Sequence, residues 1–391
     1  MKLSIDQQKC KEAVIDWYKS SRKKQFITLG GYAGTGKTTL IATISQDLRK
    51  INKKISIAFC SYTGKATQVF KHKLEEQKAI SPSDSISTIH SLIYSPILNL
   101  DEEIAGWKLK DEIKADLIIV DESSMLSESI WNDLTSYNLP IIAVGDHGQL
   151  PPIEGKFNLM EKPQLRLEKI HRQAEENPII KWSIVAREEG EIPIISEYSE
   201  HGVVKKFSRR DPDSQEEIGD LLESFNEDLL VLCGYNWTRL KLNEHIRKSR
   251  GNFTEKPIID ERVICLRNNH EENIYNGMLG RILKINEAEK GWYFAEIEMD
   301  GESSNYTGLI SVEQFNNPKS MNFTNNRSKI MKGDLFDFGY ALTVHKSQGS
   351  QSPKVLLFEE RFKSMDDDMW RRWLYTGITR AENELYIVGR E

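Results

Sequence analysis

The stretch Gly31-Tyr-Ala-Gly34-Thr-Gly36-Lys37-Thr38 is the segment from which the fold of this chain can be worked out. It follows the apolar run at residues 26–29 and precedes a helical pattern that begins at Thr39. A glycine-rich loop between a strand and a helix lets backbone N–H groups surround a polyphosphate at the helix N-terminus. In such a loop Lys37 would contact the β- and γ-phosphates, and Thr38 would bind Mg²⁺. We therefore predict a nucleotide site whose binding residues are Gly34, Thr35, Gly36, Lys37, Thr38 and Thr39.

The composition limits the class of protein. The chain has 391 residues, of which 39% are hydrophobic and 29% charged, enough for two or three domains with their own cores. Its formal net charge of −6 argues against a protein that coats DNA by charge alone, although it allows a local basic groove. The absence of a long apolar run and of a signal peptide predicts a cytoplasmic protein without a membrane partner. The four cysteines are far apart in sequence, which favours buried thiols over zinc ligands or disulfides.

Acidic and amide side chains follow two further strand-like runs. Residues 117–120 are apolar and end in Asp121 and Glu122. Beside a phosphate-binding loop, Asp121 would hold Mg²⁺, and Glu122 would orient and deprotonate the attacking water. Residues 141–144 lead to Gly145 and a double proline, which would hold Gln149 on a rigid loop beside the nucleotide. In the N-terminal helical segment, Gln7 is a candidate for contacting the adenine edge.

Four segments together resemble motifs I, Ia, II and III of superfamily 1 helicases. They are residues 31–38, 61–66, 121–125 and 145–152, and the last two are most similar to the RecD and Dda branch of superfamily 1B. The resemblance implies an ATP-dependent DNA helicase that moves 5′ to 3′ on single strands. It also implies ATP and Mg²⁺ as cofactors, and catalytic roles for Lys37, Asp121, Glu122 and Gln149.

The second half of the chain extends the resemblance. Residues 167–173 resemble motif IV, residues 339–349 motif V and residues 376–382 motif VI. Motifs IV and VI each offer an arginine, Arg172 and Arg380, whose planar charged fork suits a γ-phosphate. Because both lie beyond the first α/β segment, the resemblance implies that ATP binds between two domains.

Polar side chains at predicted strand ends outline a path for a nucleic-acid strand. Hydroxyls, amides and lysines can hold phosphates, while aromatic rings can stack on bases. For Trp237 and Tyr340 the sequence leaves stacking and core packing equally open. The predicted strand-binding residues are Thr63, Lys65, His90, Asn236, Thr238, His345 and Ser347.

The predicted fold class is α/β, with two tandem RecA-like P-loop domains built on parallel sheets. The first domain covers residues 1–165, and the second covers residues 166–248 and 333–391. Residues 91–114 would form a strand-separating hairpin carrying Tyr94 or Trp107, although an ordinary crossover fits equally well. Residues 249–332 contain short strands and Asn-Gly and Asp-Gly turns, and we expect an inserted Src-homology-3-like β-barrel.

We therefore expect a monomeric ATP hydrolase that translocates on single-stranded DNA and unwinds duplex ahead of it. Its partners would be single strands and duplex junctions, with single-strand-binding or replication proteins as further candidates, in replication, repair or recombination. One alternative is an RNA helicase of the same superfamily, because a motor that grips the backbone need not read the 2′-OH. Another is a non-motor ATPase regulator whose two lobes bind a protein partner and which needs no nucleic acid.

Overall fold

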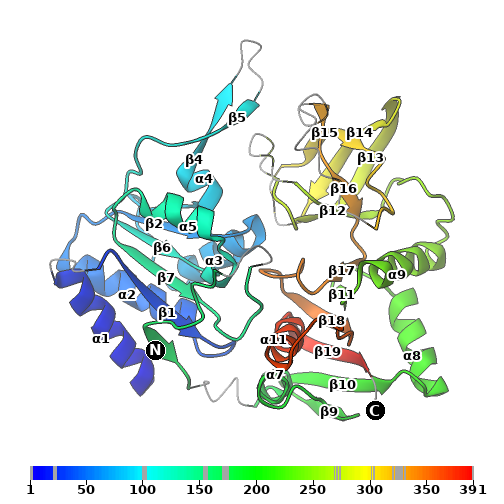
Figure 1. Ribbon diagram of the computed structural model, residues 1–391, viewed down its shortest axis with the longest axis horizontal. Coiled ribbons are helices and arrows are strands. Elements are labelled where there is room, and N and C mark those ends of the chain that lie inside the picture. Colours follow the sequence, from blue (N-terminus) through cyan, green and yellow to red (C-terminus); the bar gives the residue numbers. More distant parts are fainter. Residues whose placement is uncertain are drawn as a thin grey trace. The chain divides into compact units, whose positions relative to one another are not determined.

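The computed structural model divides the chain into two compact units, Met1–Glu176 and Asn177–Glu391, which are described separately (Figure 1). No helix within the described residues is long and apolar enough to cross a membrane. The structure describes residues 3–20, 24–98, 104–152, 157–169, 176–267, 269, 272, 274–300, 302, 304–318, 321, 329 and 332–389.

The first unit is built on a six-stranded sheet in which every pair of neighbouring strands is parallel. Gly30 on β1 lies beside Gly145 on β7, and Val120 on β6 lies beside Ala143 on the same strand. The loops that follow β1, β6 and β7 therefore emerge at one edge of the sheet. The strand order is β3 (Ser85–Thr88), β2 (Ile57–Ser61), β6 (Leu117–Val120), β7 (Ile141–Gly145), β1 (Phe26–Gly31) and β8 (Leu165–Leu167).

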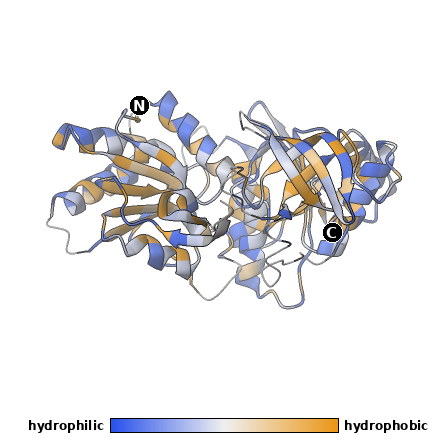
Figure 2. Cartoon of the chain, turned by 90° about the horizontal axis from the view of Figure 1, so that it is seen from above, coloured by the Kyte–Doolittle hydropathy of each residue, from blue (hydrophilic) through white to orange (hydrophobic). Residues whose placement is uncertain are grey.

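Helices cover both faces of this sheet because the central strands are apolar on both sides. On β6, for example, Leu117 and Ile119 join a core with α1 (Ile5–Lys19), α2 (Lys37–Ile51) and α3 (Gly64–Glu76). The alternate residues Ile118 and Val120 join a second core with α4 (Ile89–Ile93) and α5 (Glu128–Thr135). The hydropathy colouring in Figure 2 shows the same division between apolar strands and helices of mixed character.

Two antiparallel strands, β4 (Tyr94–Leu98) and β5 (Ile104–Leu109), form a separate small sheet in the first unit. Figure 1 shows them as an arm that extends away from the six-stranded sheet. Of the two possibilities for residues 91–114, the structure has the hairpin and not an ordinary crossover. The first unit also includes β8, part of which the sequence prediction placed beyond the domain boundary at residue 165.

The second unit contains another six-stranded sheet, parallel except at one edge, where β9 runs antiparallel to β10. Apolar residues of α8 (Pro212–Glu223) and α9 (Asn236–Ser249) pack on one face of this sheet. Contacts with the strands and with each other are also made by α7 (Pro178–Glu188) and α11 (Asp367–Ile378). The strand order is β17 (Ala341–Thr343), β11 (Leu229–Cys233), β18 (Ser352–Phe358), β19 (Ala381–Gly389), β10 (Gly202–Ser208) and β9 (Ser196–Ser199).

A third sheet of five antiparallel strands belongs to the same unit. Its order begins with β15 and ends with β16, and no closed barrel is found in the part of the chain that the structure describes. The predicted Src-homology-3-like barrel is therefore not confirmed. The last strand, β16, also lies beyond residue 332, where the prediction ended the insertion. The strands are β15 (Tyr306–Ser311), β14 (Trp292–Met299), β13 (Leu279–Glu289), β12 (Arg262–Cys265) and β16 (Phe336–Phe338).

A polar stripe along α9 fastens this third sheet to the rest of the unit. Arg239, Asn243 and Arg247 lie four residues apart and therefore share one face of the helix. Arg239 pairs with Asp337 at 2.8 Å, and Arg247 pairs with Glu261 at 2.5 Å. All these groups are buried, so removing either partner of a pair would leave an uncompensated charge. The polar side chains of α9 thus connect this helix to the five-stranded sheet inside the unit.

Candidate functional site

The loop between β1 and α2 has the backbone shape of a phosphate cradle. Gly34 and Gly36 have φ values of 76° and 73°, in the left-handed region that glycine adopts most easily. The N–H of Leu40 donates to the carbonyl of Gly36 at 3.0 Å, and no side chain of the described residues caps the helix. The N–H groups before Leu40 therefore have no partner within the helix and can receive an anion.

Lys37 folds back over this loop. Its Nζ donates to the carbonyl oxygens of Gly31 at 2.7 Å and Tyr32 at 3.0 Å. The same ammonium lies 3.8 Å from a carboxylate oxygen of Asp146, which is 1% exposed on the loop after β7. Lys37 therefore links the loop after β1 to the loop after β7 at the edge of the sheet. The sequence prediction did not include Asp146, although it lies in the quoted segment 145–152.

Two carboxylates follow β6 at the same edge. The N–H of Asp121 donates to the carbonyl of Cys60 on β2 at 2.8 Å, which fixes where the acidic pair begins. Burial and the adjacent Glu122 carboxylate raise the pKa of Asp121 to about 6, against the opposing charge of Lys37. A divalent cation would relieve this repulsion between the two acids. The buried Asp121 carboxylate beside Glu122 is therefore chemically suited to a divalent cation such as Mg²⁺.

Glu122 is held in an unusual conformation. Its φ is 52°, in the left-handed region that costs a non-glycine residue energy and that occurs often at functional sites. One carboxylate oxygen, Oε2, is buried and has no hydrogen-bond partner among the described residues. The next residue, Ser123, donates to the carbonyl of Val144 at 2.7 Å and so anchors the turn to β7. An unsatisfied, fixed carboxylate of this kind is suited to accept a proton from water.

Gln7 and Thr35 are buried beneath the loop. The side-chain amide of Gln7 donates to the Thr35 carbonyl at 3.0 Å, while its oxygen accepts from the Ser4 N–H at 3.0 Å. Thr35 is completely buried, and its hydroxyl donates to the Tyr32 carbonyl at 2.8 Å. Gln7 thus connects the start of α1 with the loop. Gln149 is 5% exposed on the loop after β7.

Two family models match segments of the chain that contain these elements. The model described as AAA domain matches residues 12–155, and the UvrD-like helicase C-terminal domain matches residues 338–388. The ATP-dependent RecD2 DNA helicase of Deinococcus radiodurans is 26% identical, and the match covers 93% of this chain and 47% of that protein. The ATP-dependent DNA helicase dda of Enterobacteria phage T4 is 24% identical over 94% of this chain and 95% of that protein. These family models and relatives support the resemblance to the RecD/Dda-like branch of superfamily 1B helicases.

One solved structure has the same fold as this chain. The Pif1 helicase from Bacteroides in complex with ADP-AlF3 and ssDNA has a TM-score of 0.54 with this chain. The match covers 99% of this chain and 92% of that one, at 16% sequence identity. This likeness supports the predicted α/β fold. The chain spans about half of the length of its RecD2 relative.

In the first unit, the predicted strand-binding residue Thr63 lies on the loop after β2, and His90 lies in the short helix α4 that follows β3. Thr63 caps α3, its hydroxyl accepting from the Ala66 N–H at 3.2 Å. His90 lies between the rings of Tyr62 and Tyr94, each 5.9 Å away, and burial lowers the pKa of its imidazole. A neutral His90 would therefore contribute hydrogen bonding or stacking but no charge. The side chain of Lys65 lies outside what the structure describes.

In the second unit, Asn236 and Thr238 lie in the first turn of α9. The Thr238 hydroxyl donates to Glu360 at 2.6 Å, and the same carboxylate accepts from the N–H groups of Gly234 and Tyr235 at 2.9 and 3.0 Å. Glu360 therefore occupies the N-terminus of α9. The sequence prediction did not name this acid, and no motif in the sequence marks it.

Two predicted residues follow β17. Burial lowers the pKa of His345, whose ring stacks on Phe362 with the centroids 6.5 Å apart. Ser347 is completely buried, and its hydroxyl donates to the carbonyl of Val344 at 2.9 Å. The role of Ser347 as a strand contact stays a prediction.

Arg380 lies between α11 and β19 and is 3% exposed. Its guanidinium donates to the carbonyls of Thr376 at 3.0 Å and Ser350 at 3.1 Å. These bonds hold the side chain in one orientation within its own unit. The other predicted arginine, Arg172, lies outside the described residues.

The predicted wedge residues differ in their surroundings. Tyr94 stands at the base of the hairpin, where its hydroxyl donates to Asp133 on α5. Trp107 on β5 lies opposite Pro96 on β4, and it is 38% exposed. Of the two, Trp107 is the aromatic side chain farther from the anchored end of the arm.

Proposed function

We propose that this chain is an ATP-dependent DNA helicase that moves 5′ to 3′ on single-stranded DNA and unwinds duplex ahead of it. One observation carries the proposal: a single sheet edge combines an uncapped helix N-terminus, the Lys37 ammonium and the unsatisfied Glu122 carboxylate. These are the groups required to bind a polyphosphate and to activate water against it. The resemblance to RecD/Dda-like helicases supports coupling of this reaction to movement along DNA.

Each side chain has a defined part in the hydrolysis. The N–H groups at the start of α2 and the Lys37 ammonium bind the phosphates. Thr38 and Asp121 would hold Mg²⁺, which would supply positive charge to offset that of the phosphates. Glu122 accepts a proton from the attacking water, and Gln149 contacts the γ-phosphate region from the loop after β7. Arg380 and Arg172 stabilise negative charge that develops during transfer.

The remaining elements concern the nucleic acid. Thr63, Lys65, His90, Asn236, Thr238 and His345 would contact the strand. The arm formed by β4 and β5 would separate the strands at a duplex junction, and the five-stranded sheet would serve as the Src-homology-3-like domain 2B of this branch. We propose that the helicase acts as a cytoplasmic monomer, with single-strand-binding or replication proteins as partners in replication, repair or recombination. The four buried, unpaired cysteines agree with a reducing compartment.

Unwinding of tailed duplexes tests substrate and direction together. With DNA carrying a 5′ tail we expect ATP-dependent strand separation at least about tenfold faster than with a 3′ tail, and ATP hydrolysis stimulated by oligo-dT. Matched RNA duplexes are the control. Faster unwinding of 3′-tailed DNA would contradict the proposed direction, and equal or better unwinding of RNA would favour an RNA helicase. Hydrolysis that responds to neither nucleic acid would favour the non-motor regulator.

Substitution of Glu122 by glutamine tests the proposed general base. We expect kcat for ATP hydrolysis to fall by about 10²- to 10⁴-fold while ATP binding is retained, because the amide keeps the shape but cannot accept the proton. Single-turnover hydrolysis and equilibrium nucleotide binding would separate the two effects. Glu128→Gln is the matched control, because this exposed acid lies only six residues away on α5. Full hydrolysis by Glu122→Gln would assign the base to another residue.

A further inference from the structure

Four rings from three separate loops of the second unit form a continuous row. Trp237 and Tyr235, at the start of α9, have ring centroids 6.3 Å apart. Tyr235 contacts Phe362, after β18, edge to face at 4.5 Å, and Phe362 contacts His345, after β17, at 6.5 Å. All three loops follow the carboxyl ends of neighbouring strands in the six-stranded sheet. The row therefore runs along the sheet edge, where α/β folds bind ligands.

The row is not part of the hydrophobic core. Trp237 is 54% exposed, whereas Tyr340, the other aromatic residue that the sequence left undecided, is 1% exposed inside the core. Tyr235, Phe362 and His345 are half-buried, so Trp237 is the exposed end of the row. An exposed indole at the end of an ordered row of rings is suited to a partner that covers it. The ammonium of Lys241 lies 4.7 Å from the Trp237 ring centroid. Contacts of this kind position the indole without removing it from solvent.

Hydrogen bonds hold the loops that carry this row in place. Glu360 binds the N–H groups of Gly234 and Tyr235 at 2.9 and 3.0 Å, and the Tyr235 hydroxyl donates to the carbonyl of Arg361 at 3.2 Å. These bonds connect the α9 loop with the loop after β18. The two loops that carry Tyr235 and Phe362 are therefore bonded to each other, and the positions of their rings are fixed before a ligand binds.

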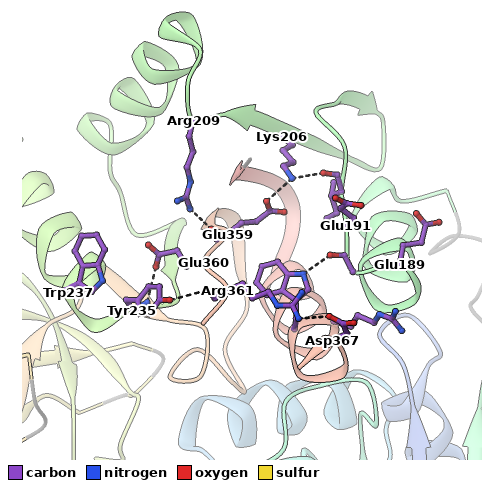
Figure 3. Close-up of a pocket in the computed structure, with 14 residues that line it drawn as sticks. Glu189, Glu191, Lys206, Arg209, Tyr235, Trp237, Glu359, Glu360, Arg361 and Asp367 are labelled. Carbon is purple, nitrogen blue, oxygen red and sulfur yellow. Dashed lines mark hydrogen bonds and ion pairs between the residues drawn. The ribbon is translucent and has the colours of Figure 1, made fainter. Parts of the chain in front are cut away.

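Beside the row lies a pocket of about 680 Å³, shown in Figure 3. Its lining includes Tyr235, Trp237, Trp370 and Arg371, together with five acids, Glu189, Glu191, Glu359, Glu360 and Asp367. This volume falls in the range of pockets that accept a small organic ring system. Lys363, which follows Phe362, is exposed. Aromatic faces next to exposed cations are the combination that binds single-stranded nucleic acid independently of its sequence.

We propose that Trp237, Tyr235 and Phe362 form a stacking platform for the bases of a single strand, with Trp237 as its exposed end. The platform rests on the proposed function, because it needs a strand to pass over the second unit. The platform adds binding energy from stacking on the flat face of a base, which the phosphate-contacting residues do not supply. A strand bound only by its backbone would have no use for it.

Strands with and without bases test the platform directly. Binding of fluorescein-labelled oligo-dT and of an abasic oligonucleotide of equal length would be measured by anisotropy. Trp237→Ala should weaken oligo-dT binding by about 5- to 100-fold and leave abasic binding unchanged, because only the former can stack. Trp237→Phe should recover most of the loss. Phe253→Ala is the control, since this ring is 76% exposed in the same unit but lies outside the row.

The outcomes separate the platform from the function on which it rests. If the unchanged chain binds oligo-dT and Trp237→Ala binds it equally well, the platform is wrong and the helicase proposal stands. Equal weakening of oligo-dT and abasic binding would also overturn it, because the side chain would then act on the backbone or on the fold of α9. If the unchanged chain binds neither oligonucleotide, both proposals fail.

Discussion

Replacement of Lys37 by alanine is expected to lower kcat/KM for ATP by about 10³- to 10⁵-fold. A charge-assisted hydrogen bond to a phosphate accounts for about 1.5–3 kcal/mol of binding, and loss of a preorganised cation at the developing charge accounts for about 10²- to 10³-fold in rate. The ammonium is already directed into the loop, at 2.7 Å from the Gly31 carbonyl. Nucleotide binding and steady-state hydrolysis, measured in parallel, would show both losses.

The matched control is Lys50→Ala on the same helix. Lys50 lies in the last turn of α2, its side chain is 76% exposed, and its ion pair with Asp47 is a surface contact. Such pairs contribute little, so this variant should hydrolyse ATP normally. Thermal unfolding without nucleotide would test whether Lys37→Ala merely loosens the loop. Unchanged ATP affinity and rate in a folded Lys37→Ala protein would contradict the proposed site.

Replacement of Arg380 by alanine is expected to remove about 10³- to 10⁵-fold of the hydrolysis rate while leaving ATP binding nearly unchanged. Arginine fingers in other nucleotidases have effects of this size because they act mainly on charge that appears in the transition state. Single-turnover hydrolysis and binding of a non-hydrolysable analogue would measure the two quantities. Arg380→Lys should remain strongly impaired, because an ammonium lacks the planar fork.

Arg380 also stabilises the fold of its own unit, and the same experiment distinguishes this structural role from a role in catalysis. Its bonds to the Thr376 and Ser350 carbonyls join the end of α11 to the segment before β18. A lower unfolding temperature with a proportionate loss of ATP binding would show that Arg380 acts through the fold. Arg210→Ala, at an exposed arginine of the same unit, controls for the general loss of a positive charge.

The parts of the site that depend on short segments could be predicted from the sequence. The run from Gly31 to Thr38 contains its own strand, loop and helix start, and Gly34 and Gly36 have the left-handed φ values that such a loop needs. The acids after β6 follow the same logic, because four apolar residues and a terminal carboxylate pair define where the strand ends. Burial of Glu122 Oε2 without a partner could not be predicted, since it depends on neighbouring segments.

Other residues were assigned by contacts between distant segments. Asp146 reaches Lys37 only because β7 lies beside β1. Glu360 reaches Thr238 because β18 lies beside β11, across 122 residues of sequence. The residues that neighbour Glu360 in the sequence do not indicate this contact. The same is true of Asn243 and Arg247, which look like surface residues of a polar helix but are buried against the five-stranded sheet.

The sequence by itself determined the resemblance to RecD/Dda-like helicases, the nucleotide loop, the acidic pair and the presence of two α/β units. These features depend on residue types at short spacings, which the backbone of a strand, loop and helix translates directly into geometry. Only the tertiary structure decided that Trp237 is exposed and Tyr340 buried, that Ser347 is buried, and that β16 pairs with β12 in the small sheet. Exposure and strand pairing depend on which distant segment covers a residue, and that segment is selected by the packing of the whole unit.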